Sequence, residues 1–146
     1  MNDEEYSALK ERIEALFDYW QARMGLKWWR VYRHYVRDAS EFRVDEERRP
    51  DTAACCHADW RYLDADVKFN MLRCRDLDDQ ELEYAVVHEL SHVLVNETRG
   101  PELKAYLGHE ERVATTVAKA FIWTRDMTIA DEGVKREATE LSGHQP

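Results

Sequence analysis

A His-Glu-x-x-His pattern, formed by His88, Glu89 and His92, lies within a strong helical periodicity. Apolar residues recur around it at spacings of three and four: Leu82, Ala85, Val86, Leu90, Val93 and Leu94. This spacing predicts a helix over about 79–95. Positions i and i+4 lie on one face of a helix, so both imidazoles can reach the same metal ion. The carboxylate of Glu89 is rotated by about 100°, where it can contact a water without being a ligand.

The start of this predicted helix carries a capping signal. Asp78 precedes the periodic run, and Glu81 follows three residues later. The pair resembles a capping box with Asp in place of Ser or Thr. The alternative is an ordinary helix whose histidines and Glu89 face a core, but a carboxylate buried there would need partners. We therefore interpret the pattern as part of a metal site.

Length and charge limit the classes of protein that fit. The 146 residues predict one domain, and the net charge of −9 argues against binding to nucleic acid or to anionic membranes. Three cysteines, Cys55, Cys56 and Cys74, form neither a disulfide framework nor a zinc ribbon, and we interpret Cys55 and Cys56 as small buried residues on a strand. With an acidic N-terminus and no apolar run of about 18 residues, the chain is expected in the cytoplasm.

The remaining patterns predict an α+β fold with a small, mostly antiparallel sheet. A single domain is expected over 1–127, and 128–146 is expected to be a polar tail, partly a frayed helix and then disordered. Asp3 is the expected N-cap of the first helix, and Gly25 is expected just beyond its end. The expected elements are a helix over 3–24, strands over 28–37, 52–59 and 63–70, a connector over 71–77, the helix 79–95, a short turn over 102–107 ending at Gly108, and a helix over 109–125. A further short strand is expected around 42–44.

A catalytic zinc usually has three protein ligands and an open position for water, so the two histidines need a third ligand. The adjacent carboxylates Glu110 and Glu111 begin the next helix and both qualify. Glu111 lies three residues before Ala114 and seven before Ala118, on a flank of small residues that permits close approach of two helices. Periodicity alone does not separate the two carboxylates.

The two motifs resemble those of the gluzincin metallopeptidases. The matching residues are Ala85-Val86-Val87-His88-Glu89-Leu90-Ser91-His92 and Glu110-Glu111-Arg112-Val113-Ala114. The resemblance is greatest to the small single-domain zinc-peptidase-like proteins of phages and prophages, and SprT-like proteins have the same core. It implies a minimal zincin-like fold and places the third ligand at Glu111. Larger gluzincins often carry an acidic residue four positions after this ligand to orient a histidine, but here that position is Thr115.

The resemblance implies a zinc-dependent peptidase. Zn²⁺ held by His88, His92 and Glu111 would activate a water, and Glu89 would act as general base. Tyr106 and His109 are candidate donors to the oxyanion because they are close to the third ligand in sequence. The expected partner is a peptide or protein substrate in extended conformation, lying along the edge of strand 52–59 or 63–69. The alternative function is a zinc-stabilised binding or structural module without turnover.

Overall fold

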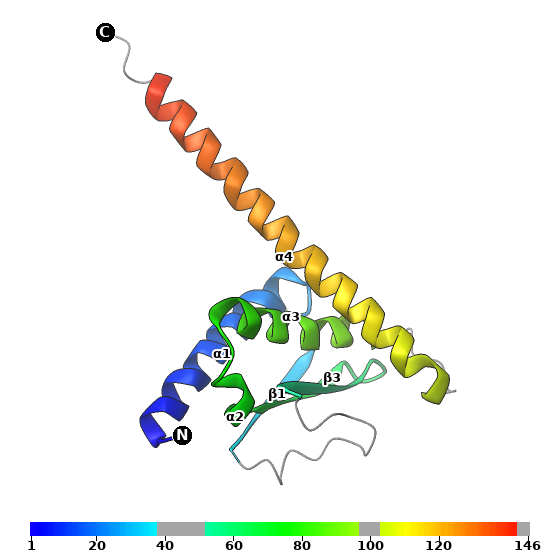
Figure 1. Cartoon of the computed structure of the whole chain (residues 1–146). Helices are drawn as coiled ribbons and strands as arrows, with labels where there is room; N and C mark the ends of the chain where they lie inside the picture. The colour runs from blue at the N-terminus through cyan, green and yellow to red at the C-terminus, as the bar shows by residue number, and fades with distance from the viewer. Residues whose placement is uncertain (38–51, 97–102, 143–146) are drawn as a thin grey trace.

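The computed structural model describes residues 1–37, 52–96 and 103–142, and within the last helix it describes the side chains of 110–130. The fold is α+β and begins with a helix (Figure 1). The elements are α1 (Asp3–Arg23), β1 (Arg30–Val36), β2 (Ala54–Asp59), β3 (Asp64–Asn70), α2 (Met71–Cys74), α3 (Asp79–Val95) and α4 (Leu103–Ser142). The strand expected around 42–44 and the end of the tail, 143–146, lie outside the described residues.

The three strands form one mixed sheet in the order β1-β3-β2. β2 and β3 form the predicted antiparallel hairpin, and Leu63 in its turn has a φ of 53°. The expectation of a mostly antiparallel sheet is wrong, because β1 pairs with β3 in parallel along its whole length, from Arg30 opposite Asp64 to Val36 opposite Asn70. Alternation of apolar and polar residues is the same in either direction, so the sequence pattern did not encode this pairing.

Both ends of α1 are defined by capping residues, although the predicted N-cap was one residue too late. The side chain of Asn2 accepts the N–H of Glu5, and the carboxylate of Glu5 accepts the N–H of Asn2. Asp3 is instead the first helical residue, where its charge is favourable to the helix dipole. Gly25 has a φ of 74°, which allows the chain to leave the helix in a left-handed conformation.

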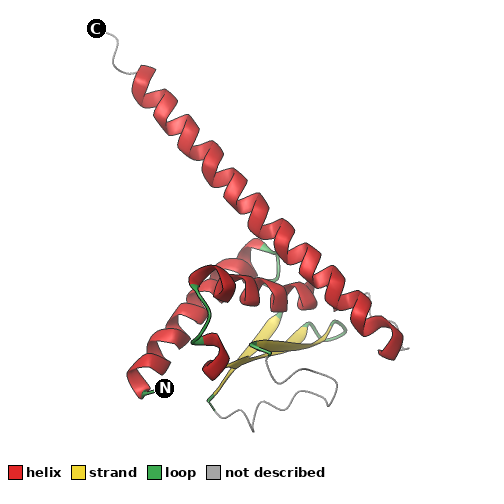
Figure 2. Cartoon of the chain, viewed as in Figure 1, coloured by secondary structure: helices red, strands yellow, loops and turns green. Residues whose placement is uncertain are grey.

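The core lies where α1 and α3 cover one face of the sheet (Figure 2). Phe69 of β3 packs edge-on against Phe17 of α1 and stacks on Tyr35 of β1, with ring centroids 6.2 Å and 5.9 Å apart. The largest fully buried side chains are Trp20, Phe17, Phe69, Ile13, Met71, Leu82, Leu90, Val67, Val86, Val87, Val93 and Cys74. The apolar stripe of the first helix is therefore core packing, as predicted.

Two other segments differ from the predictions. The connector expected after β3 contains α2, which Asn70 caps through a hydrogen bond to the N–H of Arg73. The expected turn ending at Gly108 and the expected helix 109–125 are one continuous helix that reaches Ser142. A single glycine costs a helix only about 1 kcal/mol relative to alanine, so Gly108 is tolerated where helix formers surround it.

Within the part of the chain that the structure describes, no helix combines the length and apolar character that crossing a bilayer requires.

Candidate metal centre

α3 holds the His-Glu-x-x-His pattern in a fixed orientation against the core. Its bounds match the prediction, and Asp78 and Glu81 form the expected capping box. Five apolar side chains of this helix are fully buried: Leu82, Val86, Val87, Leu90 and Val93. Because these residues fix the rotation of α3 about its axis, they also fix the direction in which the histidines project.

α4 packs against α3 through small side chains. Ala114 and Ala118 are fully buried, as expected for the flank that follows the two candidate glutamates. Farther along, Arg125 of α4 pairs with Glu83 of α3, whose carboxylate also accepts the indole N–H of Trp20 at 2.8 Å. These contacts join α1, α3 and α4, and they set the position of α4 along α3.

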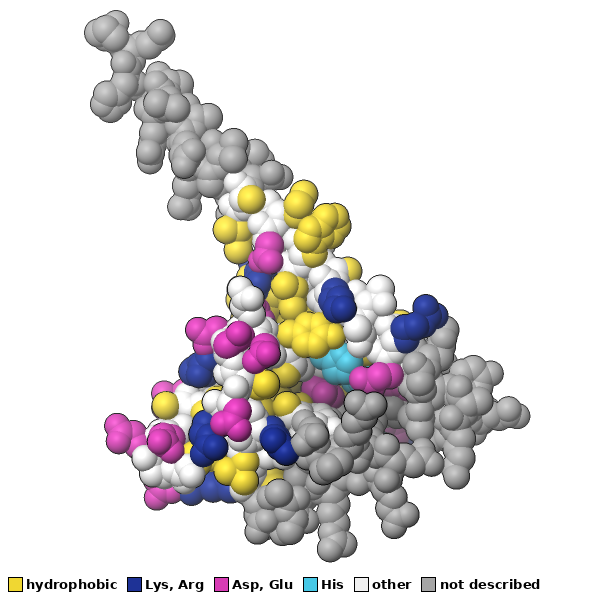
Figure 3. Space-filling model, in the orientation of Figure 1, with side chains coloured by type: hydrophobic (Ala, Val, Ile, Leu, Met, Phe, Trp, Pro, Cys, Tyr) yellow, Lys and Arg dark blue, Asp and Glu magenta, His cyan; other side chains and the backbone are white. Residues whose placement is uncertain are grey.

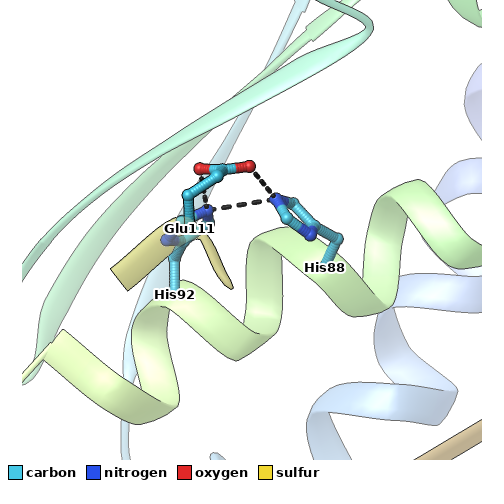
Figure 4. Close-up of side chains that lie close together, drawn as sticks. All are labelled: His88, His92 and Glu111. Carbon is cyan, nitrogen blue, oxygen red and sulfur yellow. Dashed lines mark hydrogen bonds and ion pairs between the residues drawn. The ribbon is translucent and has the colours of Figure 1, made fainter. Parts of the chain in front are cut away.

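His88, His92 and Glu111 come together in one cluster (Figure 4). The two histidines point their Nε2 atoms toward each other at 3.2 Å, and the carboxylate of Glu111 reaches both. Its Oε1 lies 3.0 Å from Nε2 of His88, and its other oxygen, Oε2, lies 3.4 Å from Nε2 of His92. The three residues predicted as metal ligands therefore present their donor atoms to a common point.

The spacing of these donor atoms bears on whether they could share one zinc ion. Donors that share one tetrahedral Zn²⁺, each about 2.1 Å from it, lie about 3.4 Å from one another. The two Nε2 atoms are 3.2 Å apart, the contacts of 3.0 and 3.4 Å from the histidines go to the two different oxygens of Glu111, and with one donor atom taken from each residue the three atoms lie within 4.8 Å of one another. Two imidazole nitrogens and one carboxylate oxygen are also a donor set that zinc accepts at catalytic sites. The residues present therefore fit a divalent metal of this kind.

Glu110 does not join the cluster but contacts the other side of the His92 ring. Its Oε1 lies 3.0 Å from Nδ1 of His92, and both side chains are buried, with 6% and 7% exposure. Burial lowers the pKa of His92, but the hydrogen bonds with Glu110 and Glu111 outweigh it and raise the pKa to about 9. Hydrogen bonds with His88 and His92 hold the pKa of Glu111 well below its usual range.

The cluster is open to solvent on the side of Glu111, because 57% of this side chain is exposed. Figure 3 shows a histidine and acidic side chains at the surface where α4 meets the body of the molecule. His88 is partly buried and has the ring of Tyr84 5.9 Å away, centroid to centroid. The Glu111 carboxylate is thus the part of the cluster that is most accessible to solvent.

Glu89 lies beside the cluster on α3 and is buried to 6% exposure. Its negative charge contributes to the raised pKa of His92. It also contributes to the raised pKa of Cys74, which burial raises most. The Glu89 carboxylate is therefore close enough to influence the charge state of His92, but it is not one of the three potential metal-binding groups.

Other residues singled out from the sequence have different positions. Tyr106 and His109 lie on α4, but their side chains fall outside the described ones, so their role as oxyanion donors is untested. Cys55 is partly buried and Cys56 buried on β2, as expected of small strand residues, and neither belongs to the potential metal-binding group found among the described residues.

The pairing of Glu110 with His92 was missed by sequence reasoning, which treated Glu110 only as an alternative ligand. A signal was present in the sequence, because Glu110, Ala114 and Ala118 recur at spacings of four on one helix face, and the structure buries all three. A carboxylate at the end of such a buried stripe must find a partner.

Comparison of the chain with models of protein families, with curated proteins and with solved structures gave no match. The function of the site is therefore inferred from its own residues and geometry.

Proposed function

We propose that the chain is a zinc-dependent peptidase of the zincin type. The observation that supports this most is the convergence of His88 and His92 of α3 with Glu111 of α4, whose potential donor atoms, one from each residue, lie within 4.8 Å of one another. When bound there, the metal would supply Lewis acidity toward a substrate carbonyl and would make a water acidic.

The chain's own residues divide the remaining work. Glu89 accepts the proton of the attacking water and returns it to the leaving amine, because it lies beside the ligands on the same helix and is not one of them. Because the Glu111 side chain is 57% exposed, water could reach a metal held by these residues from that side. Glu89 itself is largely screened from bulk water, which would limit loss of its proton to solvent.

The sheet limits where an extended substrate could lie. β3 is the central strand and is paired on both sides, by β1 and by β2, so of the two segments considered from the sequence 63–69 is excluded as a substrate edge and 52–59 remains. β2 precedes the motif helix in the chain, and its residues Ala54, Cys56 and Ala58 belong to the same core cluster as the buried face of α3.

The first experiment is the zinc content of the native chain and of His92→Ala and Glu111→Ala, purified without a chelator or a metal-affinity tag. About one zinc per chain is expected in the native protein, with loss or weakening in both variants. Far-ultraviolet circular dichroism checks that the variants fold. Native protein without zinc, even after zinc is added back, would contradict the proposal.

Activity is then tested with a mixed peptide library, with cleavage read by mass spectrometry. Glu89→Gln should keep zinc but lose at least about 100-fold in rate, the usual contribution of a general base. Asp79→Asn removes the same charge from an exposed carboxylate on the same helix and should leave the rate unchanged.

The 6% exposure of Glu89 also favours a second candidate, a zinc-stabilised binding or structural module without turnover. In that case native protein and Glu89→Gln would both bind zinc, and neither would cleave any peptide of the library.

A further inference from the structure

Both ring nitrogens of His92 face a carboxylate, and the two carboxylates come from successive residues of α4. We propose that Glu110 is a positioning residue that holds His92 in the tautomer and orientation needed for metal binding. This inference rests on the proposed metal site, but not on peptidase activity. It assigns different roles to Glu110 and Glu111, which the sequence presented as alternatives for one role.

The chemistry of the contact defines the tautomer. An ionised carboxylate only accepts hydrogen bonds, so Nδ1 of His92 must donate its proton to Glu110 across the 3.0 Å contact. In the neutral ring, Nε2 then carries the lone pair, and this is the atom that faces His88 and Glu111. A carboxylate on the far nitrogen also makes an imidazole a stronger ligand.

Burial makes this contact strong and well defined. A carboxylate and an imidazole with 6% and 7% exposure have little water to compete for their hydrogen bond. Glu111 differs, because its side chain is 57% exposed, which would suit a ligand on the solvent side of a bound metal. Exposure therefore separates two adjacent glutamates that have identical side chains.

The two histidines are held differently. Nδ1 of His88 is buried and has no hydrogen-bond partner among the groups that the structure describes, so packing orients this ring. His92 instead has the buried carboxylate of Glu110 as a hydrogen-bond partner. We therefore expect His92 to be the better-ordered nitrogen ligand, and its support to depend on Glu110.

The helical geometry of α4 explains why Glu110 has this role and Thr115 does not. Glu110 lies on the stripe of α4 that is buried against α3, four residues before Ala114. Thr115 follows one residue after Ala114 and is therefore rotated by about 100° from that stripe. The structure shows no hydrogen bond between Thr115 and either histidine in its described part.

The test measures affinity for Zn²⁺ and Co²⁺ by competition with a chromophoric chelator. Glu110→Ala should lose about 10- to 100-fold in affinity, the usual effect of removing such a partner. Glu110→Gln, which keeps a hydrogen-bond acceptor but not the charge, should lose less. Thr115→Val is the matched control on the same helix and should bind as tightly as the native chain.

The cobalt absorption spectrum separates a positioning residue from a ligand. Glu110→Ala should keep the native band positions, because the donor set is unchanged, whereas Glu111→Ala should shift them. The inference is overturned if Glu110→Ala shifts the bands as a lost ligand would, or if its affinity equals that of the native chain.

A measurement on the native protein covers the case in which the variants do not fold. In the zinc-loaded chain, two-bond ¹H–¹⁵N spectra of the histidine rings should show His92 protonated at Nδ1 and metal-bound at Nε2. The reverse pattern overturns the inference alone. Absence of any metal binding overturns the proposed function together with the inference, while metal binding without peptide cleavage overturns only the peptidase.

Discussion

At the scale of single residues, the candidate site differs from a generic cluster of acidic and imidazole groups in the burial of its members. His92 and Glu110 are buried together, while Glu111 on the next position remains exposed. A buried carboxylate is stabilised only by a partner of opposite charge or by hydrogen bonds, and here His92 provides one. The folded chain thus keeps a buried His92–Glu110 contact in which His92 is itself a proposed ligand.

Cys74 provides a test at this scale that is independent of the metal. Burial, followed by the charge of Glu89, raises the pKa of this thiol from 9.0 to about 12. Its Sγ also lies 3.4 Å from the carbonyl oxygen of Ala53, to which it donates a hydrogen bond. The protonated thiol is therefore favoured in the folded chain, whereas the unfolded chain loses the proton near pH 9.

We expect the stability that Cys74 contributes to be complete below pH 9 and to fall as the pH rises from 9 toward 12. The difference in unfolding free energy between the native chain and Cys74→Ala should shrink by about 1.4 kcal/mol for each pH unit in this range. Urea unfolding at several pH values measures it. The matched control is Cys55→Ala, because Cys55 is only partly buried, and a constant difference for Cys74→Ala would contradict the prediction.

At the scale of elements, the site depends on how α4 lies on α3. Each helix brings part of the proposed ligand set, and small side chains at Ala114 and Ala118 let the two helices approach closely. The pair of Arg125 with Glu83 holds the helices together farther along the chain. A change in this packing should therefore alter the metal site without touching a ligand.

Ala118→Leu tests this dependence. Ala118 is fully buried, so a larger side chain should cost about 1–3 kcal/mol in unfolding free energy by overpacking. Because the added volume separates α4 from α3 two turns beyond Glu111, zinc affinity should also fall. The matched control is Ala120→Leu, an exposed position on the same helix, which should change neither property.

Chemical denaturation and chelator competition measure the two effects in the same samples. A variant Ala118→Leu that is destabilised but binds zinc like the native chain would show that the interhelical distance does not govern the site.

At the scale of the whole molecule, α4 is the element that lies farthest outside the compact body (Figure 1). Its 40 residues correspond to about 60 Å of helix. Its first described side chains contribute to the site, and Arg125 still contacts α3, whereas Trp123, Met127 and Ile129 are exposed. A metal ion held by His88, His92 and Glu111 would join the N-terminal part of α4 to the body. The Arg125–Glu83 pair joins α4 to the body farther toward its C-terminus.

Zinc should therefore stabilise the whole fold. At a free concentration about 1,000 times the dissociation constant, the gain is about 4 kcal/mol, which raises the melting temperature of a chain of this size by about 10 °C. Differential scanning calorimetry with zinc and with a chelator measures the shift. His92→Ala should show little response to zinc, and an equal shift in this variant would contradict binding at the proposed site.

Local sequence patterns predicted several parts of the fold correctly. Asp78 and Glu81 indicated the start of α3, Gly25 indicated the end of α1, and the alternation in 63–70 predicted a strand of the hairpin. Each of these features depends on residues that are close in sequence. The continuity of α4 through Gly108 was not predicted, because a glycine weakens a helix without necessarily ending it.

The sequence by itself determined that His88 and His92 share a helix face and that Glu89 lies beside them, since helical geometry fixes the relation of residues one turn apart. Only the tertiary structure decided the parallel pairing of β1 with β3, and which nitrogen of His92 each carboxylate of α4 contacts. The physical reason is that these relations depend on the direction and rotation with which distant elements pack, and the alternatives have the same local pattern.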